Sequence, residues 1–218
     1  MAWPCYLCQP NTRESGQHMS PFDYFDEIFH INPDPATQRR QEMEERFEKL
    51  GIARRVRRFP AAPGADTAFA HRRIIEMASA AACRSVLVLE DDVLFLAHSL
   101  EVLAGAVAEL QGIEWSLCLL GGFRWAGEPE AVPGCRHLSL AHEVTGTHAL
   151  AYSGRIFSRL LEDLPADPED MAAWPERQQG LGQYLLGIDQ AVLVRPPVAT
   201  LPYMLPYEEP ADQFQFTV

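Results

Sequence analysis

The sequence predicts an α/β fold, a single domain with a mostly parallel central sheet. Apolar segments of strand length alternate with amphipathic segments of helix length over the first 120 residues, a pattern typical of β-α-β units. Residues 85–89 (SVLVL) are apolar on both faces, as expected for a strand in the middle of a parallel sheet. The length of 218 residues and the apolar fraction of 47% are those of one globular domain that buries a core.

The N-terminal residues 1–26 show no steady hydrophobic period and contain three prolines. We predict that they form an arm or tail in front of a domain at residues 27–218. Cys5 and Cys8 in this arm have the spacing of zinc ligands, but only His18 is nearby, and a structural zinc site needs four ligands. Five cysteines are too few and odd in number for a disulfide framework, so a reducing, cytoplasmic location is expected.

The first half of the domain is predicted to hold three strands and two helices. In the first helix, Met43, Phe47 and Leu50 recur every three to four residues. Asp66 is placed to cap the second helix. In chain order the elements are a strand at 28–32, a helix at 37–50, a strand at 54–59, a helix at 67–83 and the strand at 85–89.

The second half of the domain contains more loop signals. Proline and glycine predict loops at 123–134 and 164–180, and a proline-rich tail follows residue 189. Ser153 is placed to cap a helix that runs to residue 161. The remaining predicted elements are a helix at 94–110 and strands at 115–120, 137–140 and 147–152.

The charge balance limits the partners of the chain. A net charge of −12 disfavours binding to nucleic acid or to an anionic membrane surface. No apolar run approaches the roughly 18 residues that a membrane-spanning helix needs, so no transmembrane segment is expected. Lys49 is the only lysine, which excludes lysine from almost every catalytic role.

An acidic triplet, Glu90-Asp91-Asp92, follows the strand at 85–89 directly. Open α/β sheets bind ligands at the carboxyl ends of their strands. Adjacent carboxylates repel one another, and their oxygens suit hard cations such as Mg²⁺ or Mn²⁺, which in turn hold phosphate oxygens. The alternative is an exposed acidic loop that caps the next helix.

A basic segment at residues 39–58 strengthens the first interpretation. It contains eight basic and four acidic residues, a local charge of +4 inside a chain of −12. Arginine binds phosphate through its two-pronged guanidinium group, although a solvated helix face is the ordinary explanation for any one arginine. Together the two features indicate an anionic ligand bridged by a metal ion, such as a nucleotide diphosphate.

The receiver domain of response regulators also has an acidic pair after an apolar strand, but it does not fit. The acidic residues stand 90 residues into the chain, and the strand at 115–120 ends in glycine instead of a phosphate-accepting aspartate. No lysine follows these elements. We therefore exclude this class.

Six short segments occur in an informative order between residues 28 and 190. They are the strand at 28–32 with Arg39 and Arg40 after it, residues 58–62 (RFPAA), Ala70-His71, residues 88–93 (VLEDDV), residues 146–153 (GTHALAYS) and residues 188–190 (IDQ). In order and spacing they resemble glycosyltransferase family 25, which includes lipooligosaccharide and collagen galactosyltransferases.

The resemblance implies a GT-A-like nucleotide-sugar-binding fold. It also implies inverting transfer of galactose or glucose from a UDP-sugar to a saccharide or lipid-linked glycan acceptor, as in bacterial lipopolysaccharide biosynthesis. By position it assigns a Mn²⁺ or Mg²⁺ ion to Glu90 and Asp92, donor binding to Arg39, Arg40, His71 and Asp91, and the role of catalytic base to Asp189.

Two other functions stay open. The last histidine is His148, which we expect to be a core residue, so the late histidine ligand of many GT-A enzymes is missing. A catalytically inactive GT-A-like module that binds a nucleotide or glycan would explain this departure. A metal-dependent phosphohydrolase would need the same acidic site but no acceptor.

Overall fold

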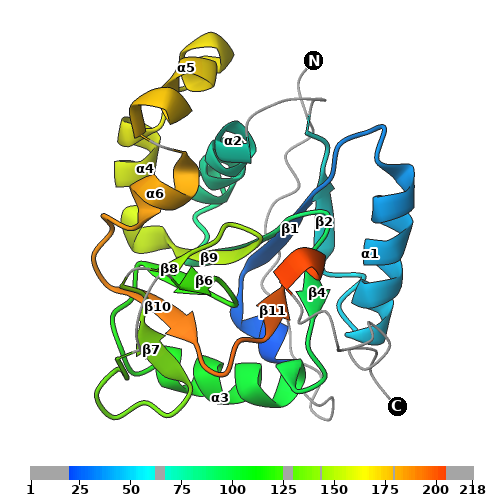
Figure 1. Cartoon of the computed structure of the whole chain (residues 1–218), viewed down its shortest axis with the longest axis vertical. Coiled ribbons are helices and arrows are strands. Elements are labelled where there is room, and N and C mark those ends of the chain that lie inside the picture. The colour runs from blue at the N-terminus through cyan, green and yellow to red at the C-terminus, as the bar shows by residue number, and fades with distance from the viewer. Residues whose placement is uncertain (1–19, 62–66, 125–129, 143, 179, 205–218) are drawn as a thin grey trace.

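A computed structural model describes residues 20–61, 67–124, 130–142, 144–178 and 180–204 (Figure 1). In these parts of the chain, seven strands form one sheet in the order β2-β1-β3-β9-β5-β10-β7. Their bounds are β1 (Glu27–Ile31), β2 (Val56–Phe59), β3 (Ser85–Leu89), β5 (Leu117–Leu119), β7 (Leu138–Leu140), β9 (Ala149–Ser153) and β10 (Ala191–Val194).

The sheet is mostly parallel. Strands β2, β1 and β3 run in one direction, and β5 and β10 share it because β9 lies antiparallel between β3 and β5. Strand β7 is antiparallel to β10 at the other border. Two small two-stranded sheets pair β4 (Leu94–Phe95) with β11 (Ala199–Thr200), and β6 (Phe123–Arg124) with β8 (Val144–Thr145).

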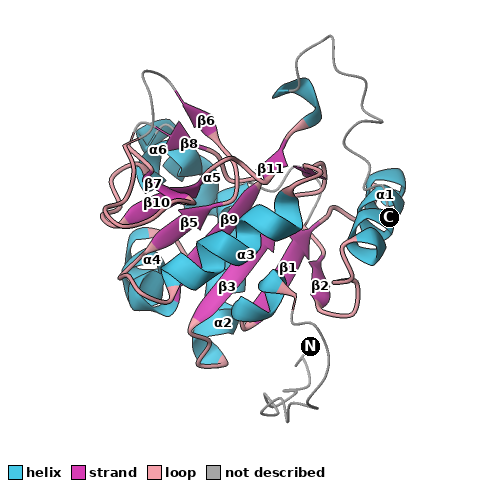
Figure 2. Ribbon diagram, turned by 90° about the horizontal axis from the view of Figure 1, so that it is seen from below, coloured by secondary structure: helices cyan, strands magenta, loops and turns pink. Residues whose placement is uncertain are grey.

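Helices cover both faces of the sheet, and Figure 2 shows α3 lying across one of them. One face packs against the 3₁₀ turn η1 (Pro21–Tyr24), α1 (Thr37–Lys49) and α3 (Ser99–Leu110). The other packs against α2 (Thr67–Ala80), α4 (Phe157–Asp163), α5 (Pro168–Gln178) and α6 (Leu181–Leu185). Two further 3₁₀ turns are η2 (Gly154–Ile156) and η3 (Pro202–Met204).

Strand β3 lies at the centre of the core. All five of its residues are buried, and its side chains alternate between the two hydrophobic clusters. Leu87 and Leu89 pack on the α1/α3 side, whereas Val86 and Val88 pack on the α2 side. The structure therefore confirms the predicted fold class, an α/β domain with a mostly parallel central sheet.

Several sequence-based expectations change. The segment after residue 189 was predicted to be a proline-rich tail, but residues 191–194 form strand β10 of the central sheet. Phe22 and Phe25 fall in the predicted arm 1–26 but are fully buried, so residues 20–26 pack as part of the domain. The helix predicted at 94–110 begins only at Ser99, because residues 94–95 form strand β4. Helix α5 occupies most of a segment that was predicted to be a loop.

Among the described residues, no helix combines the length and the hydropathy needed to cross a membrane. Cys5, Cys8 and Asp66 lie outside the part of the chain that the structure describes, and the predictions made for them stay untested.

Candidate functional site

The acidic triplet lies at the edge of the sheet where β3 ends and β9 begins. Because β9 runs antiparallel to β3, the residues in front of β9 meet the residues after β3 at this edge. The backbone N–H of Glu90 donates to the carbonyl oxygen of His148 at 2.9 Å. Gly121 and Gly122 follow β5 at the same edge, since β5 is parallel to β3. Three segments far apart in the sequence thus converge here.

Glu90 places its carboxylate among buried polar groups. Its Oε1 atom is buried and has no hydrogen-bond partner within the described residues, and it lies 3.9 Å from the Nε2 atom of His71. Burial alone would raise the pKa of Glu90, but the polar groups of His71, Thr147 and His148 together outweigh burial and hold it below the ordinary value. Glu90 is therefore ionised at neutral pH.

His71 connects Glu90 to the core. It is fully buried, and its Nδ1 atom lies 2.7 Å from the hydroxyl oxygen of Tyr152. Burial, and then the charge of Glu90, raise the pKa of Tyr152 well above its ordinary value, so the phenol keeps its proton and donates it to Nδ1. We assign the ring proton of His71 to Nε2, the atom that faces the ionised Glu90.

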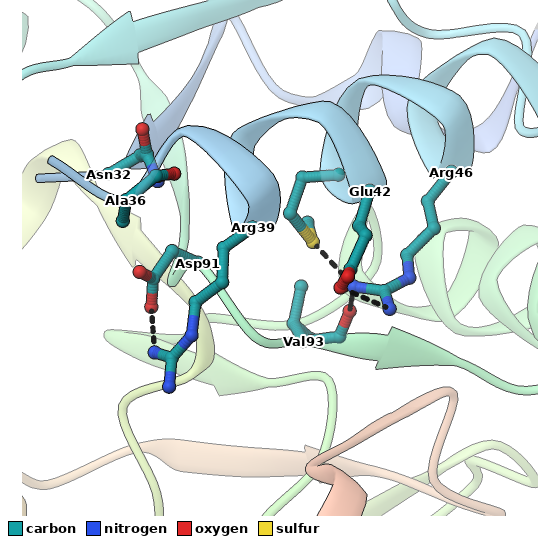
Figure 3. Close-up of polar contacts among 8 residues, drawn as sticks. Asn32, Ala36, Arg39, Glu42, Arg46, Asp91 and Val93 are labelled. Carbon is teal, nitrogen blue, oxygen red and sulfur yellow. Dashed lines mark hydrogen bonds and ion pairs between the residues drawn. The ribbon is translucent and has the colours of Figure 1, made fainter. Parts of the chain in front are cut away.

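Asp91 and helix α1 are joined by an ion pair at the surface. The Nη1 atom of Arg39 lies 3.1 Å from Oδ1 of Asp91, with 56% of the arginine side chain and 16% of the aspartate side chain exposed (Figure 3). Arg46 reaches the same loop from two turns further along α1 and donates to the carbonyl oxygen of Val93 at 3.3 Å. The structure thus brings Arg39 to the acidic triplet. It also brings Arg46 to the loop after the triplet, a contact that was not predicted.

Arg40 is not brought to the triplet. It pairs instead with Glu44, 3.6 Å away on the same helix. Helical geometry explains the difference, because adjacent residues point about 100° apart around the axis whereas residues seven apart share a face. We withdraw the assignment of Arg40 to donor binding.

The basic segment at 39–58 as a whole does not face the acidic site. Three of its arginines pair with carboxylates elsewhere: Arg55 with Asp23 at 2.5 Å, Arg57 with Glu27 at 3.3 Å and Arg58 with Asp34 at 2.6 Å. Much of the positive charge of this segment is therefore neutralised by carboxylates away from the acidic site. Only part of the segment is available to an anionic ligand at this edge.

Asp92 is half-buried, and two other carboxylates, those of Asp91 and Glu90, lie close to it. Burial raises its pKa, and the charges of Asp91 and Glu90 raise it further, while Arg39 opposes them. A cation would relieve this repulsion. No group of three or more His, Cys, Asp or Glu side chains in the described segments is placed to hold a metal ion. A cation here would depend on one or two carboxylates together with water and ligand oxygens, which is common for Mg²⁺.

Asp189 lies at the opposite edge of the sheet. It is exposed and precedes β10, whose first residue Ala191 lies in the same row of the sheet as Val86. Glu90 is four residues beyond that row and Asp189 two residues before it, which separates them by about 20 Å along the strands at roughly 3.3 Å per residue. The prediction that Asp189 is the catalytic base is therefore corrected.

A cavity of about 260 Å³ opens beside the triplet. Its lining includes Glu90, Thr147, His148 and Tyr203. The ring of His148 is 1% exposed, and burial lowers its pKa although Glu90 and the Ala199 carbonyl favour the charged form. His148 was predicted to be a satisfied core residue. It is buried, but neither ring nitrogen has a hydrogen-bond partner among the described residues.

A larger cavity, of about 690 Å³, lies at the opposite edge of the sheet beside Trp115. Its charges are already matched within the protein, since Arg155 pairs with Glu114 at 2.8 Å and Asp23 with Arg55. At the acidic edge, by contrast, neighbouring carboxylates repel one another, and the buried ring nitrogens of His148 have no hydrogen-bond partner among the described residues. This edge is the stronger candidate site.

No family model matches the chain, and no curated protein sequence matches it. A solved structure, the mannose-1-phosphate geranyltransferase from Thermus thermophilus, resembles it with 13% sequence identity and a TM-score of 0.44, over 77% of this chain and 72% of that one. A similarity this distant carries no argument about activity or substrate. Membership of glycosyltransferase family 25 is unsupported by these comparisons and stays a prediction.

Proposed function

We propose that the chain is a metal-dependent glycosyltransferase. It would move a sugar, galactose or glucose, from a UDP-sugar to a saccharide or lipid-linked glycan acceptor with inversion. The observation that carries the proposal is the crowding of Glu90, Asp91 and Asp92 at the carboxyl end of a central parallel strand, with Arg39 beside them. Carboxylates and arginine side by side suit a ligand that brings both a cation and phosphate groups.

In this proposal, the residues at the acidic edge have separate binding roles. Asp92, whose pKa is raised by burial and then by the charges of Asp91 and Glu90, is the residue best placed to hold Mn²⁺ or Mg²⁺. When bound, the ion would stabilise negative charge on the departing nucleotide. Arg39 would contact the diphosphate, and Asp91 holds the exposed guanidinium of Arg39 near the site in the meantime.

Glu90 has a different environment from Asp92. Its carboxylate faces the buried His71 and His148 rings, and its lowered pKa keeps it charged. We therefore propose that the charge of Glu90 helps to attract the cation, whereas Asp92 is its principal ligand. With Asp189 at the opposite edge of the sheet, no residue is assigned as the base that takes the proton of the acceptor hydroxyl.

One alternative is a protein that binds a nucleotide-sugar without transferring the sugar. The direct test incubates the protein with UDP-galactose or UDP-glucose, Mn²⁺ and a panel of saccharide acceptors, and measures UDP release and glycosylated product by mass spectrometry. Product formation that falls at least about 100-fold in Asp92→Asn supports the proposal. Binding of the UDP-sugar without product identifies the inactive module, and release of inorganic phosphate without an acceptor identifies a phosphohydrolase.

A further inference from the structure

The cavity beside Glu90 is lined by polar atoms that lack partners. Both ring nitrogens of His148 are buried without a hydrogen bond among the described residues, and Glu90, whose Oε1 atom faces His71, lines the same cavity. A buried polar group without a partner is costly, and native proteins rarely keep several in one place. These atoms line, or lie beside, a single cavity of about 260 Å³. A ligand that enters the cavity could satisfy them.

Glycine on two sides lets the His148 ring occupy this position. A Cβ atom on Gly121 would lie 3.1 Å from Nε2 of His148 and only 1.8 Å from the carbonyl oxygen of Ala199. A Cβ atom on Gly146 would lie 3.3 Å from Cε1 of the same ring. The backbone therefore approaches the imidazole closely from both sides, and the ring is fixed at the wall of the cavity.

The lining suits a ligand that carries hydroxyl groups. The carboxylate of Glu90 accepts hydrogen bonds, and the ring nitrogens of His148 can donate or accept, so a hydroxyl group, which does both, complements the two residues. Thr147 adds a hydroxyl group that can act in either way. A volume of about 260 Å³ lies just below the roughly 300–1,000 Å³ of drug-sized pockets, so it suits one ring-sized group and not a nucleotide.

The aromatic ring of Tyr203 stands at this cavity. The residue is 71% exposed and lines the same cavity as Glu90 and His148. An exposed aromatic ring beside a polar cavity can stack on the apolar face of a sugar ring.

We propose that this cavity is a monosaccharide subsite, in which His148 and Glu90 hydrogen-bond the hydroxyl groups of one sugar ring and Tyr203 covers it. The assignment rests on the proposed function, because it places the sugar next to the cation and diphosphate. The cavity is lined by Glu90, two residues before Asp92, and so lies beside the proposed cation, which favours the transferred sugar of the donor over the acceptor sugar as occupant.

The test uses His148→Leu in the full chain. Replacing two unpartnered ring nitrogens with an apolar side chain should leave the melting temperature unchanged or higher, whereas a structural histidine would lower it. The matched control is His30→Leu, because His30 is also a buried histidine with an unpartnered Nε2 atom but does not line the cavity. Tyr203→Ala, at an exposed position, is the second variant if His148→Leu fails to fold.

Calorimetry is done on the wild type and on every variant, and NMR on the proteins that keep His148. Calorimetry with Mn²⁺ compares the affinity for UDP with that for UDP-galactose and UDP-glucose, and NMR follows the His148 ring signals during titration with the methyl glycosides of galactose and glucose. We expect the UDP-sugar to bind more tightly than UDP in the wild type and in His30→Leu. The ratio of the affinity for the UDP-sugar to the affinity for UDP should fall about 10-fold in His148→Leu, while the affinity for UDP itself is unchanged.

The outcomes separate this inference from the proposed function. Equal affinities for UDP and the UDP-sugars, with no shift of the His148 signals by any sugar, overturn the subsite although UDP binding survives. A shift caused by inorganic phosphate and not by the sugars overturns it as well. Shifts by a methyl glycoside in a protein that does not bind UDP support the subsite and overturn the proposed function. Shifts by a methyl glycoside only when UDP is bound support a subsite for the acceptor sugar.

Discussion

The Nδ1 atom of His71 and the hydroxyl oxygen of Tyr152 lie 2.7 Å apart inside the core, and the other ring nitrogen of His71 faces Glu90. Tyr152 lies on β9 and His71 on α2, so this contact joins the sheet to the helix that covers it. The hydrogen bond fixes the ring of His71, and through it the environment of the first residue of the acidic triplet. The candidate site is therefore supported from within the hydrophobic core.

Tyr152→Phe should destabilise the protein by about 1–3 kcal/mol, because it leaves the Nδ1 atom of the buried His71 without its donor. Urea unfolding followed by circular dichroism measures the change. Tyr184→Phe is the matched control, since the Tyr184 hydroxyl donates to Asp163 at 2.5 Å near the surface. We expect the control to cost less, and equal losses in the two variants would contradict the special role of the buried pair.

Stability should fall as the pH drops from about 6.5 to 4, in part because of His30. Burial, followed by the charges of Arg58 and Arg46, lowers the pKa of His30 from 6.5 to about 4. Between these values the unfolded chain binds a proton that the folded protein does not, so the folded state loses up to about 1.4 kcal/mol for each pH unit. Above pH 6.5 the contribution is complete.

The variant His30→Leu isolates this effect, since the contributions of the carboxylates are common to both proteins. The free energy of unfolding, measured by urea titration between pH 4 and 7, should depend less steeply on pH in His30→Leu than in the wild type. Parallel profiles for the two proteins would contradict the assignment of a neutral, buried His30.

Arg39→Gln should weaken the binding of UDP in the presence of Mn²⁺ with little effect on folding. The pair with Asp91 is exposed, so its loss should change stability by no more than about 1 kcal/mol. The neighbouring variant Arg40→Gln removes the same charge from a residue that pairs with Glu44 on its own helix. Calorimetry at two salt concentrations should show reduced affinity for Arg39→Gln alone, and equal losses would mean that only general electrostatic attraction is involved.

Gly121→Ala should destabilise the domain by at least about 1–3 kcal/mol and disturb β11. The added Cβ atom would lie 1.8 Å from the backbone carbonyl oxygen of Ala199, and backbone cannot move aside as a side chain can. At Gly112 the nearest atom would be 3.5 Å away, so Gly112→Ala is the control and should be nearly neutral. Thermal unfolding compares the two, and a wild-type melting temperature for Gly121→Ala would contradict the packing described around His148.

The centre of the fold could be predicted because its signals are local. Four consecutive apolar residues, 86–89, indicate a strand buried on both faces, and the triplet that follows it lies at the carboxyl end of that strand, where open α/β sheets bind ligands. Helix α5 was missed because proline suggested a loop. Pro168, however, occupies the first helical position, where its missing N–H group costs nothing. Pro175 lies inside the helix, where proline is disfavoured, so local propensity alone did not predict α5.

The site was predicted only in part, because the residues after 189 were expected to be a tail and strand β10 was not recognised. Asp189 was assigned from its order in the chain, but it precedes β10 and so lies at the edge opposite Glu90. The contact of His71 with Tyr152 depends on how α2 packs against β9, which no local pattern reveals. Arg46 could have been found, since it stands two helical turns after Arg39 and on the same face.

We propose above that Asp92 holds a divalent cation for a nucleotide diphosphate. Calorimetric titration of UDP in the presence and absence of Mn²⁺ tests this directly. We expect UDP to bind the wild type only with Mn²⁺, and Asp92→Asn to lose at least about 10-fold in affinity while remaining folded. Asp189→Asn, at the opposite edge, should bind as the wild type does. Absence of Mn²⁺-dependent UDP binding in the wild type, or unchanged binding in Asp92→Asn, would contradict the assignment of Asp92 as the cation ligand.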